Sequence, residues 1–121
     1  MLDHIGLDVS DIQKAKHFYL AALKPLGYEL FMEWEKWVGL AVEGKPDLWL
    51  RAGNRTAPII HIAFRAQIRA IVDQFYAAAI AAGGKDNGAP GIREIYHPNY
   101  YGAFVLDPDG HNIEAICHEV E

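Results

Sequence analysis

Apolar and polar residues alternate over residues 2–9, with His4 on the polar face, which is typical of a strand with one buried side. Apolar residues spaced three and four apart then predict a helix over residues 12–26. Ser10, followed by a glutamine three residues later, is predicted to cap the start of this helix, and Gly27 is placed to end it. The chain therefore opens with a strand followed by a helix.

Three short strands are predicted to follow in the first half, and the second half repeats the order. The predicted bounds are 29–35, 37–42 and 47–51 for these strands, then 59–65 for a strand, 68–80 for a helix, and 92–96, 102–106 and 112–117 for three more strands. The last two strands are joined by Asp-Pro-Asp-Gly at residues 107–110. This sequence favours a type I turn, because proline presets the second position and glycine suits the fourth.

The second half of the chain matches the first at a shift of 57 residues, since His4 is matched by His61 and 61 − 4 = 57. The glycines that end the two predicted helices also match at this shift. Each half reads β-α-β-β-β, in units of about residues 1–53 and 59–118. A repeat of this length indicates two copies of one supersecondary unit. We predict a single α+β domain over residues 1–121 that contains both units.

Composition narrows the classes of partner. A net charge of −5 argues against nucleic acid or an anionic membrane as the main partner. With no signal-like or bilayer-spanning apolar run, we expect a cytoplasmic protein. Cys117 is the single cysteine, so an internal disulfide is excluded, and we expect this thiol to be buried and inert. The apolar content and the unpaired strand edges of a two-unit chain favour a homodimer.

Glu114 is the candidate functional residue from which the others follow. It lies in a strongly apolar strand between an isoleucine and an alanine, where a carboxylate is costly to bury without a cation. The repeat places His4 and His61 at matching points on matching strands. Two imidazoles and one carboxylate suit Fe, Mn, Zn, Ni or Co as the divalent ion, and three protein ligands leave positions open for catalysis. The alternative is that Glu114 forms a structural salt bridge with Arg51 or Arg93.

Three stretches carry a resemblance to a known family: DHIGLDVSD with the following FYLAAL, the strand IIHIAF, and AFVLDPDGHNIE. With these stretches the chain resembles the vicinal oxygen chelate superfamily of glyoxalases, bleomycin-resistance proteins, fosfomycin-resistance thiol transferases and extradiol dioxygenases. The resemblance implies that the units form an open, cup-like eight-stranded sheet. It also implies that His4, His61 and Glu114 are the metal ligands. The family's fourth ligand would fall on Trp49 or Arg51, neither of which binds a divalent cation.

The resemblance suggests two further pocket residues. Tyr101 begins the strand before the turn, where family members often place a pocket residue, as a proton donor or as an aromatic wall. His97 lies in a loop that overhangs the cup as an acid or base, or else faces solvent. His17 and His111 are read as surface residues, and the three tryptophans as a pocket lining or as packing.

Two functions remain open at this point. The first is a small metalloenzyme that binds adjacent oxygens of a small organic substrate as a lyase, isomerase, thiol transferase or dioxygenase. The second is a binding protein that sequesters a small molecule or antibiotic, as bleomycin-resistance proteins do. Because the family often exchanges units between chains, the resemblance allows His4 to join His61 and Glu114 across a dimer interface.

Overall fold

Each half of the chain folds into one helix and a four-stranded sheet in this computed structural model, which describes residues 1–121. The first unit contains β1 (Ile5–Val9), α1 (Ile12–Leu23), a 3-10 turn η1 (Lys24–Leu26), β2 (Tyr28–Trp34), β3 (Trp37–Val42) and β4 (Lys45–Ala52). The second contains β5 (His61–Arg65), α2 (Arg69–Ala81), β6 (Lys85–Ile92), β7 (Tyr101–Leu106) and β8 (Asn112–Cys117). The strand orders β1-β4-β3-β2 and β5-β8-β7-β6 are the same, which confirms the α+β class and the repeated unit.

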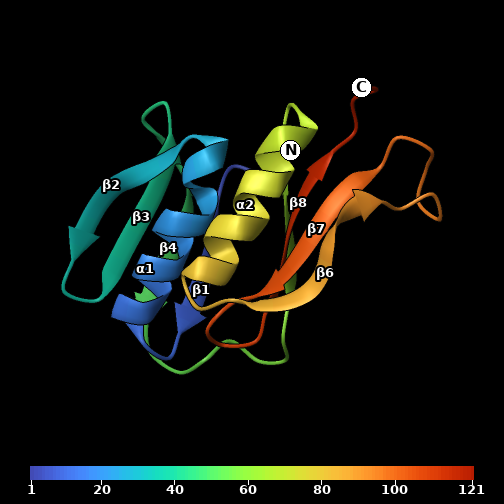
Figure 1. Cartoon of the computed structure of the whole chain (residues 1–121). Helices are drawn as coiled ribbons and strands as arrows, with labels where there is room; N and C mark the ends of the chain where they lie inside the picture. The colour runs from blue at the N-terminus through green and yellow to red at the C-terminus, as the bar shows by residue number, and fades with distance from the viewer.

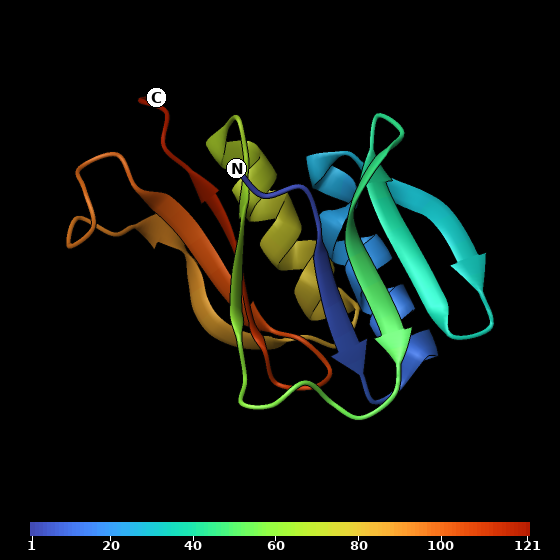
Figure 2. The ribbon, with the colours of Figure 1, turned by 180° about the vertical axis from the view of Figure 1, so that it is seen from behind.

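The two sheets lie side by side, with both helices on the same side of them (Figure 1). Strands β1 and β5 are the edges of the two sheets that lie toward the centre of the molecule, and they run in opposite directions (Figure 2). We call the face of each sheet that is turned away from the helices its open face. Trp49 marks the open face of the first sheet, and Phe104 and Glu114 mark that of the second.

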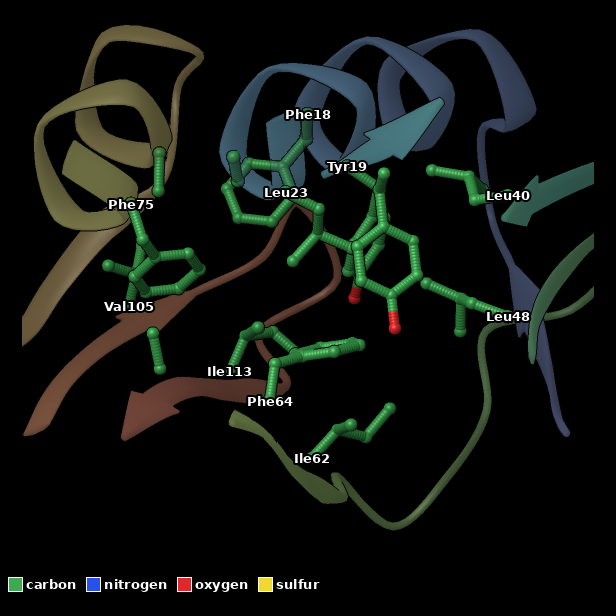
Figure 3. Packing of buried hydrophobic residues seen from close by; sticks show 14 of the residues in the cluster. Phe18, Tyr19, Leu23, Leu40, Leu48, Ile62, Phe64, Phe75, Val105 and Ile113 are labelled. Carbon is green, nitrogen blue, oxygen red and sulfur yellow. The ribbon is translucent and has the colours of Figure 1, made fainter. Parts of the chain in front are cut away.

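One hydrophobic core joins the two units between the helices and the sheets. Figure 3 shows Phe18 of α1 and Phe75 of α2 among the side chains that fill it. Phe18 reaches the second unit, where Gly84 makes room for it, because a Cβ at Gly84 would lie 2.7 Å from the Phe18 ring. The matched glycine therefore has a packing role, and the left-handed position after the C-cap of α2 is taken by Gly83, the residue before it. No helix of the chain is long and apolar enough to cross a membrane.

The start of α1 differs from the prediction. Asp11, and not Ser10, caps the helix, because its carboxylate accepts from the backbone N–H groups of Gln13 and Lys14 at 3.1 Å. Ser10 instead donates its hydroxyl to Asp109 in the turn between β7 and β8. The first unit is thereby tied to the turn of the second.

The predicted surface position of His111 is wrong, because its side chain is fully buried. Its Nδ1 accepts from the backbone N–H of Ile60 at 3.0 Å, and the backbone N–H of His111 donates to the Asp107 carboxylate at 2.9 Å. Asp107 is itself buried and accepts the hydroxyl of Tyr19 from α1. His111 therefore links the turn between β7 and β8 to the segment before β5 through hydrogen bonds.

The sixth strand also lies elsewhere than predicted. The sequence predicts it at residues 92–96, whereas β6 covers Lys85–Ile92 and residues 94–96 form a turn. Its sequence contains two glycines and a proline, which weaken the strand pattern, and its pairing with β7 is interrupted by two register shifts. β6 is an edge strand, where such irregularities are tolerated.

Candidate metal centre

Glu114 stands on the open face of the second sheet and is nevertheless buried, with 1% of its surface exposed. Its neighbours in β8, Ile113 and Ala115, point into the core, so strand alternation directs the carboxylate to the other face. On the adjacent strands it is paired with Phe104 of β7 and Ala63 of β5. The sheet therefore holds one carboxylate at its centre, as the sequence predicts.

Two side chains bind the two oxygens of this carboxylate. Glu114 Oε1 lies 3.0 Å from Nε2 of His61, and Oε2 accepts the hydroxyl of Tyr100. Gly102 leaves room for the second contact, because a Cβ there would lie 3.1 Å from Oε2. Neither alternative partner takes part: Arg51 pairs with Asp8, and the Arg93 guanidinium donates to the Ala89 carbonyl.

The hydrogen bonds of His61 orient a lone pair toward Glu114. Its Nδ1 lies 3.1 Å from the carbonyl oxygen of Asn112, which only accepts, so Nδ1 carries a proton. In the neutral ring Nε2 is then unprotonated and faces a carboxylate oxygen. Two electron-rich atoms at this distance require a cation or a further proton between them. A histidine that donates its other nitrogen to a backbone carbonyl is the usual arrangement for a metal ligand, so the pair fits a divalent ion.

His4 does not join this pair within one chain. β1 and β5 run in opposite directions (Figure 2), so the start of β1, which His4 precedes, and the start of β5, at His61, lie at opposite ends of the two strands. The cleft that His4 lines, about 250 Å³ in volume, is bounded on the β5 side by residues 62–65 and not by His61. No group of three His, Cys, Asp or Glu side chains in the chain is able to hold a metal ion. The pseudo-symmetry therefore separates the two matched histidines.

The strand register identifies Trp49 as the counterpart of Glu114. In the second sheet Glu114 is paired with Ala63 of β5. The shift of 57 residues matches Ala63 with Gly6 of β1, and in the first sheet Gly6 is paired with Trp49. The indole packs on Gly39, where a Cβ would lie 2.6 Å from the ring. Phe31 and Trp37 meet the same indole edge-on, at 6.1 and 6.5 Å between ring centroids. An aromatic cluster therefore occupies the place of a fourth ligand.

Tyr101 does not lie on the open face with Glu114, which corrects the position that the resemblance implied for this residue. Its hydroxyl donates to Asp73 of α2 at 2.6 Å, on the opposite side of the sheet from Glu114. This bond and burial raise the pKa of Tyr101 to about 12. The preceding residue, Tyr100, is the tyrosine that contacts Glu114, and burial together with the carboxylate holds its pKa well above the ordinary value. Tyr100 is therefore a protonated donor at neutral pH.

His97 belongs to an aromatic group next to Tyr100. Its Nδ1 accepts from the N–H of Asn99 at 3.1 Å, so its Nε2 carries the proton and donates to His118 Nδ1 at 2.7 Å. The His97 and Tyr100 rings meet at 5.3 Å between centroids. His97 thus contacts Tyr100, the residue that binds Glu114, and it is hydrogen-bonded to His118.

The comparisons with known proteins decide the family. The sequence model of the "Glyoxalase/Bleomycin resistance protein/Dioxygenase superfamily" matches residues 1–115. The chain belongs to this superfamily. The sequence resemblance named above is thereby confirmed.

Several known proteins are similar to the chain over nearly their whole length. A crystal structure of a glyoxalase/bleomycin resistance protein from Albidiferax ferrireducens T118 is similar with a TM-score of 0.82 and 27% identity, covering 98% of this chain and 99% of that one. The fosfomycin resistance protein FosX from Mesorhizobium loti shares the fold, with a TM-score of 0.74 at 16% identity and coverage of 99% and 93%. The uncharacterised protein YqjT of Bacillus subtilis (strain 168) is 27% identical over 96% of this chain and 98% of its own length.

Proposed function

We propose that the protein is a small divalent-metal-dependent enzyme that acts on an organic substrate with two adjacent oxygens. The observation that carries this proposal is the buried Glu114 carboxylate, 3.0 Å from a histidine nitrogen whose proton is held on the other side of the ring. His61 and Glu114 of one chain would hold the ion, with the His4 of a second chain as the third ligand. A bound divalent ion would polarise the substrate oxygens and stabilise an enolate or oxyanion.

The surrounding residues orient these ligands. Tyr100 binds Oε2 of Glu114 and so directs Oε1 toward His61. The Asn112 carbonyl selects the tautomer of His61, and the Phe104 ring, stacked at 6.2 Å between centroids, supports the imidazole. Supporting contacts of this kind fix ligand geometry and tune affinity for the metal.

Metal uptake tests the proposal. After reconstitution, the protein is expected to hold up to one divalent ion per chain, and a chelator is expected to remove it. Elemental analysis after separate loading with Mn²⁺, Fe²⁺ (without oxygen), Co²⁺, Ni²⁺ and Zn²⁺ measures the stoichiometry. His61→Ala should lower it, whereas His17→Ala, which removes an exposed histidine of α1, should not. A protein that stays free of all five ions contradicts the enzyme proposal.

We also propose a homodimer in which the open face of one chain meets that of another. Support comes from large apolar side chains that the single chain leaves exposed on and beside the first sheet: Trp34 by 60%, Phe31 by 43% and Trp37 by 38%. A dimer would offer a second His4, since that of the same chain lies away from His61. Light scattering at micromolar concentration is expected to give twice the chain mass of 13.5 kDa, and the mass of one chain would refute the dimer.

The aromatic cluster at Trp49 favours one alternative, a binding protein that sequesters a small molecule. Trp49, Phe31 and Trp37 offer flat apolar surface at the position where a fourth ligand would stand. Such a protein needs no metal. Stoichiometric uptake that His61→Ala lowers therefore separates the enzyme from the binding protein.

A further inference from the structure

Arg93 lies on the open face of the second sheet, beside the residues that contact Glu114. Its backbone N–H donates to the Tyr100 carbonyl at 2.7 Å, so the two residues stand opposite each other where β6 ends and β7 begins. Its guanidinium lies 5.5 Å from the centroid of the Phe104 ring. Phe104 also stacks on His61, 6.2 Å away. Arg93 and the proposed metal ligand His61 therefore contact the same aromatic ring.

The chain makes room for the Arg93 guanidinium. A Cβ at Gly91 would lie 3.1 Å from Nη1, and a Cβ at Gly88 would lie 3.2 Å from Nη2. Nη2 donates to the carbonyl oxygen of Ala89 at 2.7 Å. Two glycines, a carbonyl and an aromatic ring thus hold a half-buried cation in one position.

The charge of this guanidinium is not balanced within the chain. Arginine has five N–H donors, and the Ala89 carbonyl occupies one of them. No carboxylate forms an ion pair with Arg93, whereas Arg51 on the other sheet pairs with Asp8 at 2.8 Å. A fixed, unpaired arginine in a protein of net charge −5 is suited to bind an anion through paired donors.

We propose that Arg93 binds an oxyanion of the substrate, a carboxylate or a phosphate-type group, while the substrate's two adjacent oxygens face His61 and Glu114. This proposal rests on the proposed metal function. Glu114 lies in β8, and Arg93 lies at the end of β6. These two strands are separated by two strand spacings, about 10 Å. A substrate with a short carbon chain between its two polar ends fits this separation.

Three probes test the proposal by calorimetry on the Co²⁺-loaded protein. 2-Oxoglutarate has adjacent oxygens and a distal carboxylate, 2-oxovalerate has the same carbon chain without that carboxylate, and phosphonopyruvate carries a phosphonate instead. All three probes carry the carboxylate next to the keto group, so the comparison isolates the distal anionic group. We expect at least one of the two probes with a distal anionic group to bind roughly tenfold or more tightly than 2-oxovalerate, because a charge-assisted pair contributes at least that much. The probe that is preferred distinguishes a carboxylate from a phosphate-type group.

Substitutions assign the preference to Arg93. Arg93→Met keeps an unbranched side chain over Phe104, and it is expected to abolish the preference while 2-oxovalerate binds as before. Arg69→Met is the matched control, because Arg69 lies 5.2 Å over the Tyr101 ring on the helix side of the sheet. Arg69→Met is expected to keep the preference.

The outcomes separate this proposal from the metal function. If the protein takes up no metal, both the metal function and the role of Arg93 are refuted before any probe is added. If metal and 2-oxovalerate bind but neither probe with a distal anionic group binds more tightly, the role of Arg93 is refuted and the metal function stands. A preference that survives in Arg93→Met also refutes it. Should Arg93→Met melt abnormally, Arg93→Lys must keep a salt-sensitive preference and Arg93→Gln must lose it.

Discussion

Glu114→Gln is expected to weaken binding of the divalent metal at least tenfold, or by about 1.4 kcal/mol of binding free energy. Glutamine keeps the volume and the strand position of the side chain but removes the charge that neutralises the ion. The metal dissociation constant, measured by competition with a chelator of known affinity, gives the effect. Any activity found should fall together with metal occupancy.

The same substitution is expected to leave the metal-free protein as stable as before, or slightly more stable. In the metal-free protein Glu114 faces Nε2 of His61 at 3.0 Å and accepts the Tyr100 hydroxyl. A glutamine oxygen still accepts from Tyr100, and its amide N–H donates to His61, so both contacts are satisfied. The buried charge is removed as well, which relieves a desolvation cost. The melting temperature of the metal-free variant measures this.

A matched control separates the site from a general effect of charge. Glu119→Gln removes an exposed carboxylate just beyond the same strand, and it should change neither metal affinity nor melting temperature. If Glu114 and a protonated His61 instead form a structural ion pair, Glu114→Gln would lower the melting temperature of the metal-free protein and leave metal affinity nearly unchanged. That pair of results would contradict the proposed role of Glu114.

The repeat explains why so much of the fold could be predicted from the sequence. His4 immediately precedes β1 and His61 begins the matched strand β5, and the phase of strand and helix after them is the same in both halves. The burial of Glu114 also followed from the sequence, because its neighbours in β8 are apolar. Both conclusions depend on local periodicity, which survives folding when an element has one buried face.

The misplaced residues depend on long-range pairing, which periodicity alone does not give. Tyr101 begins the strand, but the hairpin pairs Phe104 with Glu114, so even-numbered residues of β7 share the face of Glu114. Counting back from the turn through this register would have selected Tyr100. His111 gave no such signal, because its burial depends on how the turn packs under α1 and the segment before β5.

The separation of His4 from His61 likewise depends on the long-range arrangement of the strands, which local periodicity does not give. A pseudo-twofold axis between antiparallel β1 and β5 sends matched residues to opposite ends of the junction (Figure 2). Two histidines at matched positions therefore reach one metal only if one of them comes from another chain. Sequence comparison of the halves finds the pair but not the direction in which the strands run.

Mixing His4→Ala chains with Glu114→Gln chains is expected to restore metal sites that neither variant forms alone. If each site takes His4 from one chain and the pair His61 and Glu114 from its partner, a mixed dimer has one site with both changes and one intact site. Random pairing makes half of the dimers mixed, so about a quarter of the wild-type sites should return. Metal content of the unselected dimers after co-expression measures this recovery, and mixed dimers isolated by tandem purification with two different tags should regain about half of the wild-type sites.

His61→Ala mixed with Glu114→Gln is the matched control for this experiment. His61 and Glu114 lie 3.0 Å apart on one sheet of one chain, so every site in that mixture keeps one defect and none should recover. Recovery in the first mixture and not in the second would establish a site shared between chains. If neither mixture recovers although both form dimers, His4 belongs to a different place from His61 and Glu114, and the third ligand must be sought elsewhere.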